Sequence, residues 1–175
     1  LDILSRKRGM SGVFFAFARF FPEVSARFAT QETFSYDNDK ASIRKAVLKL
    51  TVFFTPASIL PSSQNGHDVF IVIDLIRATT CMAVMLDQGA QRIFAAGTVE
   101  QARAAKERFP RRLLCGERNV KPLPGFDYGN SPVQFSQADL RERELIMTTT
   151  NGTRAFHACP PDAIRLAGSL YNAEA

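Results

Sequence analysis

The sequence predicts an α/β fold in which a mostly parallel or mixed sheet has helices packed on both faces, forming an α/β/α sandwich. From Lys49 onward, short runs of β-branched and aliphatic residues alternate with segments of helical spacing. The length of 175 residues suits one such domain. Hydrophobic residues make up 46% of the chain and charged residues 22%, which is ordinary for a protein with a packed core.

The strands are predicted from apolar runs that turn residues interrupt. The run LTVFF at 50–54 stops at Thr55 and Pro56. The run VFIVI at 69–73 is continuous, which is typical of a strand buried on both faces. Further strands are expected at 92–96, from Leu113 and Leu114 onward, at 144–149 and at 163–168.

Helices are predicted between these strands. Residues 79–88 have helical spacing and Gly89 follows as a stop, while Thr98 is a suitable N-cap for a helix through Phe109. Asn151 begins another helix, and residues 171–175 open a last one. We expect a domain over 49–175 that is truncated at its C-terminal end, so that its fold is incomplete.

Residues 1–48 are expected to form a separate extension, either poorly ordered or an amphipathic helix. Arg6, Lys7 and Arg8 precede an apolar run at 12–21, so a targeting role is the alternative. Residues 30–45 suggest a linker with a short helix. Residues 1–50 hold nine Lys or Arg and five Asp or Glu, so most of the net charge of +5 lies there and nucleic acid is not an expected partner.

The cysteines and the hydropathy pattern limit the setting. Cys81, Cys115 and Cys159 show no CxxC spacing, which argues against zinc fingers and disulfide scaffolds and favours a cytoplasmic location. No stretch approaches the roughly 20 apolar residues of a membrane helix, so no membrane partner is expected. Whether the chain forms a homo-oligomer stays open.

Polar residues at the carboxyl ends of strands are the first functional candidates, because ligands bind there in open α/β sheets. Asp74 ends a predicted strand, and Arg77 lies three residues further on. Thr79 and Thr80 stand at a helix start, which favours an anion. A carboxylate for Mg²⁺ and a guanidinium for phosphate would make a phosphate site. The simpler interpretation is an Asp–Arg pair with a threonine cap.

Two loops add further candidates. Glu117 follows a short strand and is a candidate second metal ligand or general base, unless it merely pairs with Arg118. Cys115 is expected to be a small core residue. In the loop at 125–132, Asn130 and Ser131 offer hydrogen-bonding groups to an anion, and a plain turn is the alternative.

The string TTTNGTR at 148–154 runs from a strand into a helix start. Its hydroxyls, amides and one cation would favour a phosphate, a sulfonate or a carboxylate. GxxxxGK[ST] and GxGxxG are absent, so neither a P-loop nor a dinucleotide site is expected. His67 and His157 lack metal-like spacing and are interpreted as bystanders.

Six strings, in this order, resemble the 2-phosphosulfolactate phosphatase family. They are VFFTP (52–56), VIDLIRATT (72–80), LLCGER (113–118), GFDYGNSP (125–132), TTTNGTRA (148–155) and GSLYNAEA (168–175). The family's versions are close to VIDVLRATT, GGER, GFDLGNSP and TTTNGT. Residues 1–48 have no counterpart, and residues 119–121 stand where a glycine-containing stretch is expected. Family members continue beyond the position of Ala175.

The resemblance implies an Mg²⁺-dependent phosphatase that hydrolyses (R)-2-phospho-3-sulfolactate to 3-sulfolactate and phosphate, a step of coenzyme M synthesis. Asp74 would bind Mg²⁺ or attack phosphorus, Glu117 would be a second metal ligand or base, and Arg77 would stabilise charge. The residues expected to bind the small anionic substrate are Thr79, Thr80, Arg118, Asn130, Ser131, Thr149, Asn151, Gly152, Thr153, Arg154 and Asn172. The alternatives are a non-catalytic small-anion-binding module and an inactive fragment of the same fold.

Overall fold

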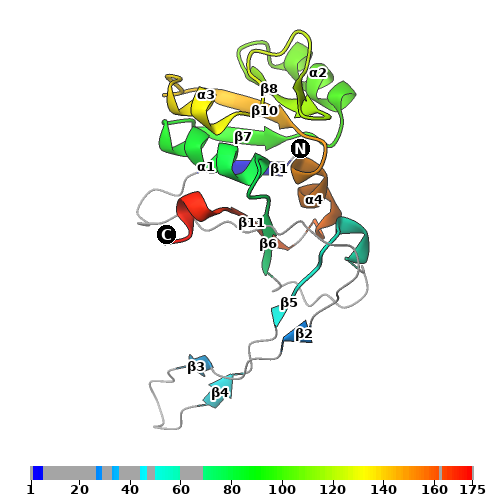
Figure 1. Ribbon diagram of the computed structural model, residues 1–175, viewed down its shortest axis with the longest axis vertical. Coiled ribbons are helices and arrows are strands. Elements are labelled where there is room, and N and C mark those ends of the chain that lie inside the picture. The colour runs from blue at the N-terminus through cyan, green and yellow to red at the C-terminus, as the bar shows by residue number, and fades with distance from the viewer. Residues whose placement is uncertain are drawn as a thin grey trace.

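A five-stranded sheet forms the centre of the computed structural model, which describes residues 2–5, 27–28, 33–35, 44–46, 50–59, 69–161 and 163–174 (Figure 1). Its strands, in spatial order, are β1 (Asp2–Ser5), β7 (Arg92–Ala95), β10 (Glu144–Thr148), β8 (Leu113–Arg118) and β9 (Lys121–Pro122). The central strand β10 runs parallel to both β7 and β8, and the two outer strands pair antiparallel. The expected parallel or mixed sheet is therefore confirmed.

In the described ranges, four α-helices and two 3₁₀ turns accompany the strands. They are α1 (Ala78–Asp87), α2 (Val99–Arg108), α3 (Pro132–Ser136), α4 (Gly152–Ala158), η1 (Pro56–Ser58) and η2 (Leu170–Asn172). Thr98 caps α2 as expected, because its Oγ1 accepts the Gln101 N–H at 3.1 Å. The helix expected at 171–175 is instead the short 3₁₀ turn η2. None of the helices in the described ranges has the length and hydropathy that a bilayer crossing requires.

The two faces of the main sheet bury different helices, because successive side chains of a strand point to opposite faces. Leu145 and Met147 of β10 join a cluster that contains residues of α1, α3 and α4. Ile146, between them, joins a second cluster with Ala102 and Ala105 of α2. The expected arrangement of helices on both faces is confirmed, and the apolar run at 144–148 supplies both layers.

A second, smaller sheet lies on the far side of α1 (Figure 1). It consists of β6 (Val69–Ile73) and β11 (Ile164–Gly168), which pair in parallel. Val72 packs into the core, but Val69 and Ile71 are 51% and 48% exposed on the other face. The expectation that 69–73 is buried on both faces was wrong. A continuous apolar run does not specify whether its second face is covered.

Two short strand pairs complete the described elements. β2 (Arg27–Phe28) pairs with β5 (Leu50–Thr51), and β3 (Thr33–Ser35) pairs with β4 (Arg44–Ala46). The strand expected at 50–54 ends at Thr51, and Phe53 stacks on Phe70 with ring centroids 6.5 Å apart. Phe53 therefore serves packing rather than strand pairing.

Several expectations for the first 48 residues lie outside the described residues. The apolar run at 12–21 is one of them. Where 30–45 is described, it is strand, so the expected short helix is not found in those positions. The division of the chain at 48/49 stays a prediction. β1, which precedes that boundary, pairs with the edge of β7 in the main sheet.

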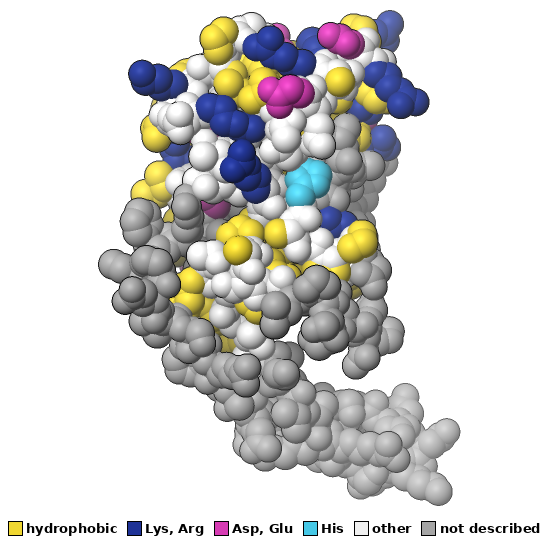
Figure 2. Space-filling view, turned by 90° about the vertical axis from the view of Figure 1, so that its right-hand side faces the viewer, with side chains coloured by type: hydrophobic (Ala, Val, Ile, Leu, Met, Phe, Trp, Pro, Cys, Tyr) yellow, Lys and Arg dark blue, Asp and Glu magenta, His cyan; other side chains and the backbone are white. Residues whose placement is uncertain are grey.

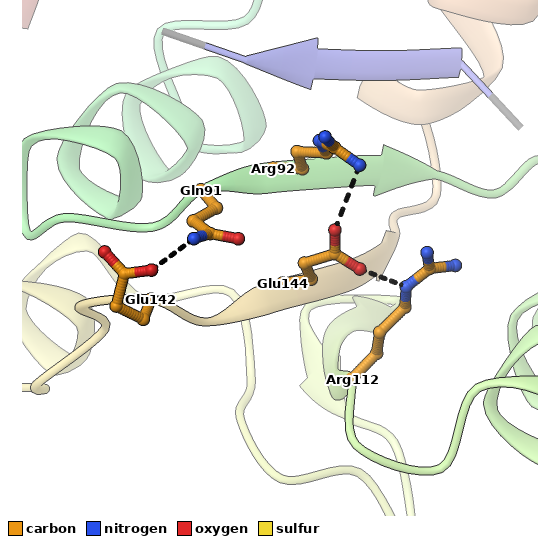
Figure 3. Close-up of polar contacts among 5 residues, drawn as sticks. All are labelled: Gln91, Arg92, Arg112, Glu142 and Glu144. Carbon is orange, nitrogen blue, oxygen red and sulfur yellow. Dashed lines mark hydrogen bonds and ion pairs between the residues drawn. The ribbon is translucent and has the colours of Figure 1, made fainter.

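A charged cluster fastens the amino-terminal edge of the main sheet (Figure 3). Glu144, the first residue of β10, accepts a hydrogen bond from Arg112 Nε at 2.7 Å. Its carboxylate also forms an ion pair with Arg92 at 3.3 Å. The Arg112 guanidinium carbon also lies 3.7 Å from the ring centroid of Phe94 and 3.8 Å from that of Phe109. Gln91 and Glu142 hydrogen-bond beside this cluster. Arg112 is therefore held both by stacking on two aromatic rings and by its ion pair with Glu144.

Replacing Arg112 with alanine is expected to lower the free energy of unfolding by about 1–3 kcal/mol, since stacking, stem packing and a charge-assisted bond are lost together. Arg112→Lys keeps the charge but loses the planar stack, so it is expected to recover only part of that loss. Arg92→Ala is the matched control, because its side chain is 54% exposed and shares the same carboxylate. It should cost about 0–1 kcal/mol. Equal losses for both arginines in urea denaturation would contradict the role of stacking.

Candidate functional site

Asp74 lies directly after β6, at the start of the turn that leads into α1. The Asp74 N–H donates to Thr79 Oγ1 at 2.9 Å. The Thr79 hydroxyl lies 2.8 Å from the Asp74 carbonyl oxygen and 2.6 Å from that of Gly168, at the end of β11. Thr79 is fully buried, so its hydroxyl joins the ends of β6 and β11. This local role accounts for a threonine that we expected to bind substrate.

The Asp74 carboxylate lies against the turn that carries Asn151 and Gly152. A Cβ atom placed on Gly152 would lie 3.0 Å from Asp74 Oδ2 and 2.4 Å from the Cβ of Ala78. Glycine therefore allows the first residues of α1 and α4 to approach each other. Asp74 and the Thr-Asn-Gly-Thr string occupy one edge of the molecule, as the sequence-based hypothesis requires.

The threonines of this string use their hydroxyls locally. Thr149 and Thr153 bond reciprocally, each accepting at Oγ1 the backbone N–H of the other at 3.0 Å. Both are buried. The Asn151 side chain forms no capping hydrogen bond, and the Asn151 carbonyl accepts the Ala155 N–H at 3.1 Å. Thr149 and Thr153 therefore fix the turn, and Asn151 keeps its amide group for other contacts.

Glu117, the fifth residue of β8, is almost fully buried, with 7% of its surface exposed. Its Oε1 accepts the Thr150 N–H at 2.7 Å. Its Oε2 accepts the Val120 N–H at 2.8 Å and the Thr150 hydroxyl at 3.0 Å. The carboxylate thus joins the β8–β9 turn to the turn after β10.

The β8–β9 hairpin contains the residues 119–121, where the family pattern has a glycine-containing stretch and this chain does not. Asn119 and Val120 have φ values of 51° and 68°, so both central residues of this two-residue hairpin are left-handed. Asparagine tolerates that conformation, whereas a β-branched residue is strained in it. The glycine that the family pattern leads one to expect would relieve this strain.

Val120→Gly is expected to raise the free energy of unfolding by about 0.5–1 kcal/mol and the Tm by about 2–4 °C, because removal of strain outweighs the greater freedom of glycine in the unfolded chain. Val120 is 73% exposed, so little packing is lost. Val133→Gly, at a 66% exposed valine of α3, is the matched control and should lower the Tm. A decrease in Tm for both variants would show that Val120 is unstrained.

Two arginines lie near the ends of β8 and β10. Arg118 donates from Nη1 to the Glu117 carbonyl oxygen at 2.7 Å and from Nη2 to Thr148 Oγ1 at 2.8 Å. Partial burial lowers the pKa of the Arg118 guanidinium, and the positive charge of Arg154 lowers it further. Arg154 is exposed on α4. Several Lys and Arg side chains are visible on the face shown in Figure 2. Two nearby cations favour an anion between them.

Arg77 precedes α1 and is half-buried, and its charge and that of Asp74 both act on the thiol of Cys81. Burial raises the pKa of that thiol well above its usual value, the Arg77 charge opposes the shift and the Asp74 charge adds to it. Burial likewise raises the pKa of Cys115, which is fully buried as a core residue, as expected. Neither thiol is suited to nucleophilic attack.

Asn130 combines burial with an unsatisfied polar atom. It is 6% exposed, and its Oδ1 has no hydrogen-bond partner among the described residues. A buried acceptor without a partner costs about 1–3 kcal/mol, so a ligand that donates to it would recover stability. The next residue, Ser131, caps α3 by accepting the Gln134 N–H at 3.4 Å. Sequence reasoning missed α3, although Ser131 followed by Pro132 is a recognised start signal.

The remaining candidates also bond locally. Thr80 donates to the Leu75 carbonyl oxygen at 3.0 Å. Asn172 Oδ1 accepts the Ser169 N–H at 3.0 Å and the Ser169 hydroxyl at 2.9 Å, which caps η2. His157, interpreted as a bystander, places Nε2 3.1 Å from the Ala95 carbonyl oxygen. These contacts stabilise turns around the site.

The structure adds Thr148 and Thr150 to the site, because Thr148 contacts Arg118 and Thr150 contacts Glu117. The string TTTNGTR predicts the region, but its composition alone does not separate these two threonines from Thr149. Successive side chains at a strand end point to opposite sides, so Thr148 and Thr150 project differently from Thr149. That periodicity was the signal that could have identified them.

Of the two acids expected to bind a magnesium ion, Glu117 does not fit that role, so a site at this edge would have Asp74 as its acid. No group of three His, Cys, Asp or Glu side chains that could bind a metal occurs in the described part of the chain. Mg²⁺ often binds through one or two carboxylates and keeps several waters, so a single acid suffices. Both oxygens of Glu117 already accept N–H or O–H donors.

The fold belongs to the class of α/β proteins that place polar residues at the carboxyl ends of parallel strands. Here Asp74 follows β6 and Arg118 ends β8. The sequence profile of the family described as 2-phosphosulpholactate phosphatase matches residues 53–175. The chain belongs to the 2-phosphosulpholactate phosphatase family, which confirms the resemblance found in the sequence.

Curated relatives named "Probable 2-phosphosulfolactate phosphatase" agree with this membership. A protein of Deinococcus radiodurans is 44% identical over 118 residues, covering 67% of this chain and 49% of that protein. One of Parasynechococcus marenigrum is 40% identical over 130 residues, covering 73% and 53% respectively. One of Clostridium acetobutylicum is 40% identical over 106 residues, covering 60% and 45%. The chain spans about half the length of the curated relatives it matches.

Proposed function

We propose that this chain carries the catalytic edge of an Mg²⁺-dependent phosphatase that hydrolyses (R)-2-phospho-3-sulfolactate to 3-sulfolactate and phosphate. The observation that carries the proposal is the placement of Asp74 Oδ2 3.0 Å from the Cβ position of Gly152, within the family's matched region. This placement brings the Asp74 carboxylate to the first residues of α1 and α4. The name shared by the relatives supports the same reaction class.

The substrate carries phosphate, sulfonate and carboxylate on a three-carbon frame, so its site needs several cationic groups. Arg77 lies three residues after Asp74, in the turn before α1, and is assigned to the phosphoryl oxygens. The charge of Arg154 is close enough to lower the pKa of Arg118, and the two arginines are assigned to the second anionic group. Asn130 Oδ1 is assigned to a donor of the substrate, such as a protonated oxygen.

Asp74 has two candidate roles in the hydrolysis. It either binds the magnesium ion, while water attacks the phosphorus, or attacks the phosphorus itself. In the second role the P–O bond to sulfolactate breaks as an aspartyl-phosphate forms, the sulfolactate oxygen takes a proton from water, and a second water hydrolyses the aspartyl-phosphate to phosphate and the free carboxylate. A divalent cation held there would neutralise charge on the phosphoryl oxygens. In both roles the ionised carboxylate is required, and the arginines orient the substrate beside it. The Asp74 carboxylate repels an anionic substrate, and a magnesium ion held there would offset that repulsion, which favours the metal-dependent reaction over a purely anion-binding role.

The test is a phosphate-release assay with (R)-2-phospho-3-sulfolactate and with 2-phospholactate, which lacks the sulfonate. We expect release that requires Mg²⁺ and stops with EDTA, and a KM for 2-phospholactate that is about 10–100-fold higher because a charge-assisted contact is missing. Equal KM values would remove the sulfonate from recognition. Binding of the substrate in calorimetry without any release would assign the chain to the non-catalytic anion-binding class.

A further inference from the structure

We propose that Glu117 is a positioning residue of this site, rather than the metal ligand or base that its sequence position suggests. Its buried carboxylate holds the β8–β9 turn and the turn after β10 together, and thereby sets the position of Arg118 and of the Asn151–Gly152 segment beside Asp74. The inference rests on the proposed function for its effect on catalysis. The positioning itself rests on contacts of the chain alone.

The contacts leave Glu117 little capacity for another partner. It accepts two backbone N–H groups, from Thr150 at 2.7 Å and from Val120 at 2.8 Å, and the Thr150 hydroxyl at 3.0 Å. A carboxylate offers about four acceptor positions, so three are used here. With 7% of the residue exposed, the fourth has little access to solvent.

The chemistry of the three donors requires a carboxylate at this position. The Thr150 hydroxyl itself accepts the Asn119 N–H at 3.2 Å, so its own proton is directed to Glu117. All three groups that face Glu117 are therefore donors. An ionised carboxylate accepts them all, whereas a glutamine amide would place its NH₂ opposite at least one N–H.

The link from these turns to the site is short. Thr150 immediately precedes Asn151 and Gly152, and the Cβ position of Gly152 lies 3.0 Å from Asp74 Oδ2. Arg118 follows Glu117 and donates to Thr148, two residues before Thr150. Loss of the hydrogen bonds to Glu117 would therefore displace both Arg118 and the Asn151–Gly152 turn, without removing any group that is assigned to contact the substrate.

The experiment compares Glu117→Gln and Thr150→Val, which removes the hydroxyl but keeps the backbone N–H, with Glu107→Gln in α2 as the exposed control. We expect Glu117→Gln to raise KM for (R)-2-phospho-3-sulfolactate about 10–100-fold, as for outer contacts that orient a site. Thr150→Val should raise it less, and the double variant should show less than the product of the two effects, because both act on one network. Glu107→Gln should leave KM unchanged.

Two further readouts separate positioning from metal binding. The Mg²⁺ concentration for half-maximal activity should stay the same in Glu117→Gln, whereas hydrogen exchange at the Thr150 and Val120 amides should accelerate. A raised Mg²⁺ requirement with both amides still protected would overturn the proposal. If the wild-type chain releases no phosphate, the proposed function fails, and the amide exchange still decides the positioning role. If Glu117→Gln does not fold, Thr150→Val decides by the same two readouts.

Discussion

Gly116→Ala is expected to destabilise the protein by on the order of 3 kcal/mol or more, because the added methyl group has nowhere to go. Its Cβ would lie 1.9 Å from the backbone oxygen of Thr148 on the neighbouring strand. The φ of Gly116 is +144°, which L side chains rarely adopt. β8 and β10 would have to separate at the end that carries Glu117 and Arg118. Urea denaturation measures the loss.

Gly125→Ala is the control that separates collision from backbone strain. Gly125 also has a positive φ, of +77°, but nothing lies within 4 Å of its Cβ position. This variant should cost only about 1–2 kcal/mol, the cost of a left-handed alanine. If the two variants lose equal stability, β8 and β10 do not approach as closely as the structure shows.

Asp74→Asn is expected to reduce phosphate release by about 10³-fold or more, because asparagine keeps the shape of the side chain but not its charge. The backbone N–H and carbonyl of Asp74, which bond Thr79, are unchanged, so the Tm should shift little. Binding of inorganic phosphate should be retained or become tighter, since the repulsion between two negative charges is removed.

Asp139→Asn provides the charge-matched control for this variant. Asp139 is exposed and pairs with Arg141 at 2.8 Å, and this pairing lowers the pKa of its carboxyl to about 2. Its loss should leave phosphate release unchanged. Turnover of Asp74→Asn near the wild-type value would exclude Asp74 from the chemistry.

The local elements of the described part were largely predictable from the sequence, because periodicity and capping are local properties. The expected helix at 79–88 is α1 at 78–87, and the expected helix from the Thr98 cap is α2 at 99–108. The strand at 144–149 is β10 at 144–148. In each case an apolar pattern and a turn or cap signal agreed.

Strand pairing was less predictable, because an apolar run does not specify its neighbours. The pairing of β6 with β11 apart from the main sheet depends on where α1 packs. The run at 50–54 has high β-propensity, yet it forms a strand only at Leu50–Thr51, since pairing and burial decide strand formation.

The candidate site was predicted as a region rather than as a set of roles. The close approach of α1 and α4, rather than strand order within one sheet, brings Asp74 to the Gly152 turn. The roles of Thr79, Thr149 and Glu117 depend on which donors surround them, and that depends on tertiary contacts. Residue type alone therefore identified the polar groups of the site. It did not show which of them form hydrogen bonds within the fold.

The cluster of Arg112, Glu144 and Arg92 lies at the amino-terminal edge of the sheet, whereas Asp74 and Arg118 lie at or beyond the carboxyl ends of their strands. The hydrogen bonds and ion pairs of the Arg112 cluster and those of Arg118 involve different residues in the described part of the chain, so the free-energy changes of substitutions at these two edges should add. Directed evolution could therefore introduce stabilising substitutions at one rim to tolerate costly, specificity-altering ones at the other.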